Sequence, residues 1–367
     1  MDTKRFNRSF NKIVDNVNSV IYGKDDVVRL SMVAICAGGH ILFEDVPGVG
    51  KSVMARALGQ SMRATMNRVQ CTPDMLPGDI TGSSVIDTST MKFTFRPGPV
   101  FTHVLLVDEV NRATPKTQSA MLEAMAEKTV SVDGVTHPLP QPFIVLATQN
   151  PVELAGTFPL PEAQLDRFLF KLTMGYPDHQ AEIAVMMGNS VRLEVDDLEP
   201  VIDTSEVLDM MALSSEVKVS TAVQNYIVDI TQATREDRSL TLGAGPRASI
   251  NLVKASRVLA ASDGRDRVYP EDVKAILRPV LGHRIMLTPD ATLRGETIDE
   301  VLDRVLARVK APMGVDDDPQ SWEGAAPTRS AEPDETDEDL VEAAAAPSRS
   351  PASTRARRAT KQRAATR

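Results

Sequence analysis

The stretch that decides the fold is DVPGVGKS at residues 45–52. An apolar run at residues 41–43 precedes it, and Met54, Leu58 and Met62 follow at the four-residue spacing of one helical face. A glycine-rich turn between a strand and a helix directs unpaired backbone N–H groups at an anion, and the positive end of the helix dipole adds to the attraction. The sequence therefore predicts a phosphate-binding loop. Its expected nucleotide contacts are Pro47, Gly48, Val49, Gly50, Lys51, Ser52 and Val53.

Three side chains of this loop have separate expected tasks. Lys51 would contact the β- and γ-phosphates of a nucleotide, and Ser52 would bind Mg²⁺. The usual pattern begins with glycine, whereas Asp45 stands here. Because aspartate tolerates the left-handed backbone better than most residues, we expect Asp45 to permit the same turn.

A second motif combines an apolar strand with two carboxylates. Val104–Val107 is followed directly by Asp108 and Glu109. We expect Asp108 to hold Mg²⁺ through water and Glu109 to act as the general base on the attacking water. Alone, the pattern also fits a strand that ends in a solvated acidic loop. Together with Lys51, it supplies both halves of a nucleotide-hydrolysing site.

Three further polar residues are candidates for the same chemistry. Asn150 ends the apolar strand 143–147 and would orient water or contact the γ-phosphate; alternatively it caps the turn before Pro151. Arg167 and Arg247 are candidates to neutralise the charge that develops on the γ-phosphate. Each arginine alone is equally typical of a surface ion pair, and spacing assigns neither role.

Strands and helices alternate through the first half of the chain. Continuous apolar runs predict buried strands at 104–107 and 143–147, and another strand is expected at 168–172. Thr114 and Pro115 predict the start of a helix through residue 125. This alternation is typical of an α/β fold with a mostly parallel sheet, which we assign to residues 1–176.

Beyond residue 176 the strands are expected to stop. Residues 177–311 read as amphipathic helices, including one that carries Val223, Tyr226, Ile227 and Ile230 on one face. Residues 312–367 form a third, acidic-then-basic segment: eleven acidic and one basic residue up to position 346, then seven basic and no acidic residues. With little to bury, this tail is expected to be disordered, either as an electrostatic interaction arm or as a solvated extension.

Composition excludes several classes of protein. The 367 residues carry a net charge of −9, with 42% hydrophobic residues, and two cysteines (Cys36 and Cys71) are too few for a disulfide scaffold. No apolar run approaches the roughly 20 residues of a membrane helix, and the first residues lack an apolar signal core. We therefore expect a cytoplasmic protein and exclude secreted, membrane-spanning and fibrous classes. No histidine pair has metal-binding spacing, so no metal besides Mg²⁺ is expected.

Four longer runs together resemble the signature of the MoxR family of AAA+ ATPases. They are DEVNRATPKTQSA at 108–120, PDMLPGDITG at 73–82, RPGPV at 96–100 and LPEAQLDRF at 160–168. The resemblance covers about residues 6–311. It implies an AAA+ P-loop NTPase domain with a parallel sheet, a C-terminal helical lid domain, ATP and Mg²⁺ as cofactors, and a self-assembled ring that is usually a hexamer.

The resemblance also implies roles for single residues. Asn150 would be sensor 1, Arg167 the arginine finger that reaches the neighbouring subunit's ATP, and Arg247 the sensor 2 that brings lid movement to the γ-phosphate. Adenine would lie near residues 20–23, with Ile21 and Gly23 as contacts. Arg112 lies near the acidic strand and remains an alternative to Arg167 as the contact between subunits.

Three functions are weighed. The resemblance implies a chaperone-like ATPase that remodels, matures or activates protein complexes whose identity is unknown, with partners that carry von Willebrand factor A domains. A nucleic-acid-associated AAA+ motor is the alternative, for which only the basic tail offers contacts, because the chain before it has a net charge of −6. A nucleotide-gated scaffold with negligible turnover is the third.

Two predicted hairpins are protrusions that could pass nucleotide-driven movement to a partner. They flank residues 88–91 and Asp133-Gly134, and would face a pore or a partner, or else cover the edge of the sheet.

Overall fold

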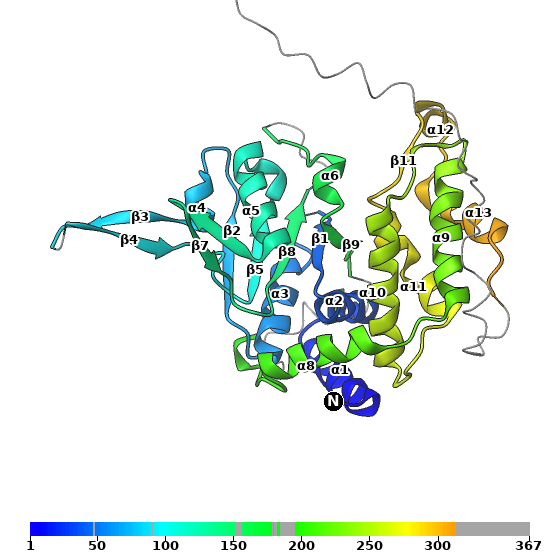
Figure 1. Ribbon diagram of the computed structural model, residues 1–367, viewed down its shortest axis with the longest axis horizontal. Coiled ribbons are helices and arrows are strands. Elements are labelled where there is room, and N and C mark those ends of the chain that lie inside the picture. Colours follow the sequence, from blue (N-terminus) through cyan, green and yellow to red (C-terminus); the bar gives the residue numbers. More distant parts are fainter. Residues whose placement is uncertain are drawn as a thin grey trace, which may run out of the picture. The chain divides into compact units, whose positions relative to one another are not determined.

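The computed structural model describes residues 1–46, 48–89, 91–150, 156–177, 179, 182–183 and 195–312. The predictions for Pro47 and for the tail beyond residue 312 lie outside the described residues. Figure 1 shows a central sheet with helices around it. Its five strands are parallel, in the order β2-β5-β8-β1-β9. They are β1 (His40–Glu44), β2 (Met66–Gln70), β5 (Val104–Asp108), β8 (Ile144–Gln149) and β9 (Phe168–Leu172).

The apolar strand residues divide between the two faces of this sheet. Successive side chains of a strand point to opposite faces, and in β5 Val104 and Leu106 join one hydrophobic cluster whereas Leu105 and Val107 join another. Both faces are therefore covered, which explains the continuous apolar runs in the sequence. The first cluster includes residues of α1 (Thr3–Asn18), α2 (Asp25–Cys36) and α3 (Lys51–Ser61); the second includes residues of α4 (Pro77–Thr81) and α5 (Pro115–Glu127).

Local signals placed the helices beside the sheet correctly. Met54, Leu58 and Met62 are buried along α3 and at its end. The Thr114 side chain accepts a hydrogen bond from the Thr117 N–H at the start of α5, as its N-cap position predicts. The remaining short elements of this half are a 3₁₀ turn at Val110–Arg112 and α6 (Glu162–Leu165). The α/β fold class and its parallel sheet are thus confirmed.

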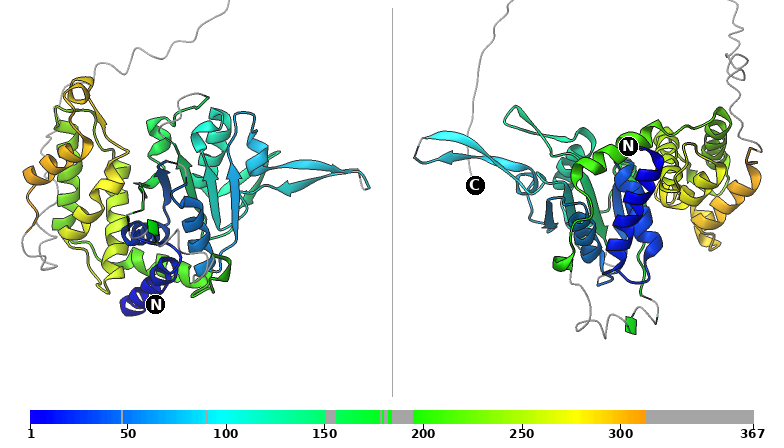
Figure 2. Two further views of the ribbon diagram at one scale, coloured as in Figure 1. Left: turned by 180° about the vertical axis from the view of Figure 1, so that it is seen from behind. Right: turned by 90° about the horizontal axis from the view of Figure 1, so that it is seen from below.

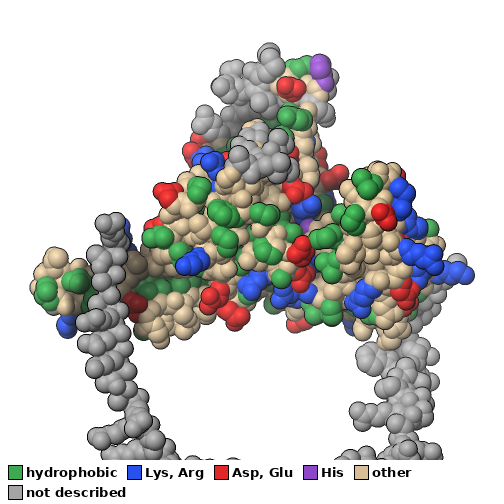
Figure 3. Space-filling model, turned by 90° about the horizontal axis from the view of Figure 1, so that it is seen from above, with side chains coloured by type: hydrophobic (Ala, Val, Ile, Leu, Met, Phe, Trp, Pro, Cys, Tyr) green, Lys and Arg blue, Asp and Glu red, His purple; other side chains and the backbone are tan. Residues whose placement is uncertain are grey.

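Two hairpins extend from the α/β region, as the sequence predicts. The first pairs β3 (Gly82–Asp87) with β4 (Lys92–Pro97), and the second pairs β6 (Thr129–Val132) with β7 (Val135–Pro138) around the predicted Asp133-Gly134 turn. The β3–β4 hairpin points away from the sheet in the views of Figures 1 and 2. Figure 3 shows hydrophobic side chains near its end, and Met91 and Phe93 are 77% and 73% exposed there.

The C-terminal half is mainly helical, as expected. Val223, Tyr226, Ile227 and Ile230 are all buried along α9. Besides a 3₁₀ turn at Val195–Asp197, the helices are α8 (Thr204–Glu216), α9 (Thr221–Glu236), α10 (Pro246–Ser262), α11 (Pro270–Leu281), α12 (Pro289–Leu293) and α13 (Ile298–Arg308).

The prediction that strands stop after residue 176 is wrong. Leu240–Leu242 (β10) and Met286–Leu287 (β11) form a short antiparallel pair that joins the segments after α9 and α11. Three and two residues are too short to show a strand periodicity.

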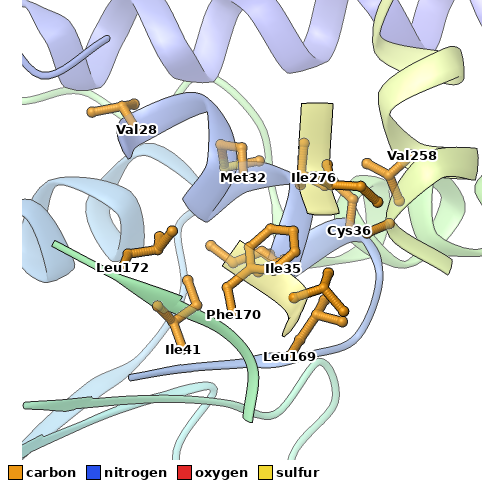
Figure 4. Packing of buried hydrophobic residues seen from close by; sticks show 14 of the residues in the cluster. Val28, Met32, Ile35, Cys36, Ile41, Leu169, Phe170, Leu172, Val258 and Ile276 are labelled. Carbon is orange, nitrogen blue, oxygen red and sulfur yellow. The ribbon is translucent and has the colours of Figure 1, made fainter. Parts of the chain in front are cut away.

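The helical half and the sheet share one hydrophobic cluster. In Figure 4, side chains of α2, β1 and β9 lie together with side chains of α10 and α11; those labelled are Val28, Met32, Ile35, Cys36, Ile41, Leu169, Phe170, Leu172, Val258 and Ile276. This packing seats α11 and the segment after it beside β9. The domain division at residue 176 stays a prediction. Within the described ranges, we find no helix that is both long and apolar enough to cross a membrane.

Candidate functional site

The phosphate-loop segment has the backbone that the sequence predicts. Gly48 and Gly50 adopt positive φ angles of 84° and 95°, and Gly50 is the N-cap of α3, which begins at Lys51. A Cβ at Gly48 would meet no described atom within 4 Å, so there is open space beside the turn at this residue. The Lys51 Nζ donates to the carbonyl oxygens of Asp45 (3.1 Å) and Val46 (2.8 Å). Burial lowers the pKa of Lys51, and the carboxylates of Asp45, Asp108 and Glu109 oppose that shift.

Asp45 has a different reason to be there from the one the sequence suggested. Its φ is not among the positive values, so tolerance of a left-handed backbone is not the reason that aspartate is accommodated in this turn. Instead its buried carboxylate accepts three backbone N–H groups, from Val46 (2.9 Å), Met174 (2.6 Å) and Gly175 (2.8 Å). The side chain therefore ties the phosphate loop to the segment that follows β9, a contact that glycine cannot make.

One cavity of about 330 Å³ lies at the carboxyl ends of β1, β5 and β8, where parallel sheets commonly bind ligands. It collects most of the predicted nucleotide-site residues from three separate parts of the sequence. Its lining consists of Asp45, Gly48, Gly50, Lys51, Ser52, Val53, Arg68, Gln70, Asp108, Glu109, Thr148, Gln149 and Asn150. Val49, by contrast, packs against the hydrophobic cluster.

Asp108 is buried at the end of β5 and already has two partners. Thr148 Oγ1 donates to its Oδ1 (3.3 Å), and Arg68 Nε donates to its Oδ2 (2.7 Å). Sequence reasoning missed Arg68, which comes from β2 at the edge of the sheet. The strand β2 pairs with β5 and sets Gln70 opposite Asp108, so Arg68 could have been found from the sequence only by recognising β2 as a neighbour of β5.

Glu109, unlike Asp45, has a left-handed backbone. Its φ and ψ are 55° and 50°, a conformation that is costly for residues other than glycine and that concentrates at functional sites. The Glu109 N–H donates to Thr148 Oγ1 (3.0 Å), which helps to hold this turn. Its carboxylate accepts from Arg112 Nη1 (3.2 Å), so Arg112 lies beside the acidic pair of its own chain.

The other candidates divide between two places. Asn150 is buried and lines the cavity with the acidic pair. Ile21 and Gly23 are not among its lining residues. The next residue, Lys24, contacts the segment after β9 that also binds Asp45: its Nζ donates to the Tyr176 carbonyl (2.8 Å), next to Gly175.

Arg167 and Arg247 lie together in a second cavity, of about 500 Å³. Its lining also includes Lys128 and Lys254, so it holds four cationic side chains and one carboxylate, that of Asp166. His40 at the start of β1 lines this cavity, whereas Asp45 just beyond β1 lines the first. At about 3.3 Å per strand residue, five residues separate the two edges by about 16 Å.

Hydrogen bonds hold both arginines at this second edge. Arg167 Nη1 donates to the Leu122 carbonyl, and Arg247 Nη1 pairs with Asp166 Oδ2 at 3.4 Å. His40 is buried between the Val145 N–H, which donates to Nδ1 (3.0 Å), and the Met125 carbonyl near Nε2 (3.2 Å). Burial lowers the pKa of His40 to about 4, and with backbone partners at both ring nitrogens its role is structural.

The first cavity suits a magnesium nucleotide. Mg²⁺ prefers oxygen ligands, and is typically held by one or two carboxylates together with phosphate oxygens. Ser52 and Asp108 offer such oxygens, and Lys51 with the open turn at Gly48 suits the phosphates. Among the described residues, we find no group of three His, Cys, Asp or Glu side chains arranged to bind a metal.

Comparisons with known proteins agree with this geometry. Residues 40–170 match the model of the ATPase family associated with various cellular activities (AAA), and residues 232–305 match an AAA lid domain. The chain is 46% identical over 302 residues to the uncharacterized protein YeaC of Bacillus subtilis, covering 82% of this chain and 94% of YeaC. It is 38% identical over 312 residues to the chaperone MoxR1 of Mycobacterium tuberculosis, covering 82% of each.

A solved structure and a further relative also resemble this chain. The crystal structure of a candidate ATPase from Cytophaga hutchinsonii superimposes with a TM-score of 0.79 at 35% identity, over 85% of this chain and 97% of that one. The protein MoxR of Methylorubrum extorquens is 30% identical over 321 residues, covering 81% of this chain and 93% of its own. The chain therefore belongs to the MoxR family of AAA+ ATPases.

Proposed function

We propose that the protein hydrolyses ATP with Mg²⁺ in the cavity at the end of β1. The observation that carries this proposal is the convergence of Lys51, Asp108, Glu109 and Asn150 on one cavity from three strands. A scaffold that only binds nucleotide would need neither a general base such as Glu109 nor a water-orienting amide such as Asn150 in this cavity.

Each residue has a specific task in this proposal. Lys51 binds the β- and γ-phosphates, and Ser52 and Asp108 hold Mg²⁺, Asp108 through water. The bound Mg²⁺ neutralises charge on the phosphates. Glu109 takes a proton from the attacking water, and Asn150 orients that water or contacts the γ-phosphate. Ile21 and Gly23 belong to the proposed adenine site.

Arg167 is proposed to act on a neighbouring subunit's nucleotide, and Arg247 to be the sensor 2 that brings lid movement to a γ-phosphate. Both line a cavity at the opposite edge of the sheet from their own Lys51, about 16 Å away by strand length. This placement supports a ring, for which we propose a hexamer. It also favours Arg167 over Arg112 as the contact between subunits, because Arg112 pairs with its own Glu109.

The cycle is proposed to drive remodelling of partner complexes, with von Willebrand factor A domain proteins as partners. The name of the M. tuberculosis relative, a chaperone, supports this role. The exposed hydrophobic side chains of the β3–β4 hairpin, including Phe93, offer a surface for such a partner.

We place the activity in the cytoplasm. Cys36 and Cys71 are both free and buried, and burial raises the pKa of each thiol to about 12. Protonated, unpaired thiols are compatible with a reducing compartment.

The proposal is tested by trapping the complex with its client. Glu109→Gln should retain ATP binding and arrest the cycle, so an affinity pull-down with this variant and ATP should enrich partner and client. Lys51→Ala should bind no ATP and enrich neither. ATPase stimulation by a von Willebrand factor A protein should exceed that by DNA; strong stimulation by DNA alone would favour the motor.

A further inference from the structure

Arg284 is a buried cation that the proposed cycle does not use. It follows α11, and its side chain is only 2% exposed. A buried charge is costly unless ion pairs and hydrogen bonds compensate it. Burial lowers the pKa of Arg284, and the hydrogen bond and charge of Asp166 oppose that shift. The contacts that compensate this charge therefore show what the residue holds in place.

Its contacts surround Arg167 on both sides in the sequence. Arg284 Nε pairs with Asp166 Oδ1 (2.8 Å), and Nη2 donates to the Asp166 carbonyl (3.0 Å). Nη2 also donates to the Phe168 carbonyl, and Nη1 donates to the Leu169 carbonyl (3.1 Å). The planar guanidinium thus fixes the backbone just before and just after Arg167.

The other end of this arrangement belongs to the helical half. Arg284 Nη1 also donates to the carbonyl of Val280 in α11. His283 approaches the same Phe168 carbonyl (3.0 Å), and burial together with the Arg284 charge lowers the His283 pKa well below its usual value. A neutral imidazole adds no second buried charge beside Arg284. The turn that carries Arg167 is therefore bound to the end of α11.

Asp166 forms ion pairs with two arginines, which differ in length and in burial. The Asp166 side chain is 34% exposed. Its pair with Arg284 is 2.8 Å long and the Arg284 side chain is 2% exposed, whereas its pair with Arg247 is 3.4 Å long and the Arg247 side chain is 52% exposed. Exposed pairs contribute little, and truncating one partner of a buried pair is costly. Arg284 therefore holds Asp166, and with it the backbone turn that carries Arg167, more firmly than Arg247 does.

We propose that Arg284 is a positioning residue for Arg167, holding its turn so that the side chain reaches the nucleotide of the neighbouring subunit. This proposal rests on the proposed action of Arg167 in trans. It predicts that a subunit with an Arg284 substitution still binds ATP in its own cavity but no longer supports ATP hydrolysis in the neighbouring subunit.

The test uses mixed rings. Arg284→Met should retain ATP binding, measured with a fluorescent nucleotide, within about twofold, while phosphate release falls about tenfold or more, as expected for a misplaced catalytic group. Rings mixed with Lys51→Ala subunits, which lack ATP binding but have an intact Arg167 turn, should regain part of the activity. Rings mixed with Arg167→Ala subunits should not.

Two further variants keep the test informative. Arg284→Lys retains the charge without the planar fork, so it should show a smaller loss with the same pattern of rescue, even if Arg284→Met does not fold. Arg278→Met is the matched control, because Arg278 is an exposed arginine of α11 that pairs with Asp299; its turnover should match the wild type.

The outcomes separate this proposal from the one it rests on. If Arg167→Ala with Lys51→Ala regains activity in rings shown to be mixed, but Arg284→Lys with Lys51→Ala does not, the positioning role is overturned and trans action stands. Wild-type turnover of Arg284→Lys and Arg284→Met also overturns it. If Arg167→Ala itself shows no rescue, trans action fails, and the positioning role fails with it.

Discussion

Replacing Asp45 with glycine restores the usual first residue of a phosphate loop, yet we expect it to destabilise the protein. If Asp45 were present only for its backbone conformation, glycine would serve at least as well. In the structure, its carboxylate instead accepts the N–H groups of Val46, Met174 and Gly175. The substitution removes all three hydrogen bonds at a side chain that is 6% exposed.

The size of the effect follows from these contacts. A buried donor left without its partner costs about 1–3 kcal/mol, and hydrogen bonds to charged groups are at the upper end. Met174 is buried and Gly175 is half-buried, so their two N–H groups account for about 2–5 kcal/mol. The added flexibility of glycine contributes up to about 1 kcal/mol through the unfolded state. We expect a total loss of about 2–6 kcal/mol.

Urea denaturation of Asp45→Gly and the wild type measures this loss directly. Asp45→Asn is the matched control: its amide oxygen can still accept one or two of the N–H groups, so it should lose about half as much. A glycine variant as stable as the wild type would refute the reasoning, and would return Asp45 to a backbone role.

The remaining predictions concern pH and the hairpin. Because the folded-state pKa of His40 is about 4 and that of an unfolded histidine is about 6.5, its contribution to stability is complete above pH 6.5 and is lost as pH falls toward 4, by about 3 kcal/mol. Urea denaturation between pH 4.5 and 8 should therefore show a weaker acid dependence for His40→Gln, but not for His179→Gln, whose side chain is exposed. Phe93→Ser, at an exposed hairpin position, should leave basal ATPase activity unchanged and reduce stimulation by a von Willebrand factor A partner; unchanged stimulation would exclude this face of the hairpin.

The interior of the sheet was predictable because its strands are buried on both faces. Continuous apolar runs predicted β5 and β8 to within two residues at each end, and the further strand expected at 168–172 has the bounds of β9. The strand β2 has no such run, because only Val69 of its five residues is buried; β9 is also an edge strand, but four of its five residues are buried. Missing β2 also meant missing Arg68, the partner of Asp108.

The candidate site was predictable where its chemistry is local in sequence. The loop at 48–53 and the pair Asp108-Glu109 lie on consecutive residues, so their spacing indicated the cavity. Roles that depend on contacts between distant parts of the chain could not be predicted in this way. Asp45 contacts Met174 and Gly175, which follow it by 129 and 130 positions, and Arg284 contacts Asp166, which precedes it by 118 positions. Proximity of Arg167 to Arg247 likewise follows from packing, not from spacing.

The central claim, that the cavity at the end of β1 hydrolyses ATP with Glu109 as the base, is tested most directly by phosphate release in a single turnover. The wild type should release phosphate from bound ATP with Mg²⁺. Glu109→Gln should bind ATP with similar affinity, but should release phosphate at least about 100-fold more slowly. Glu123→Gln, an exposed change on α5, is the control and should match the wild type. Release by Glu109→Gln at the wild-type rate would contradict the account.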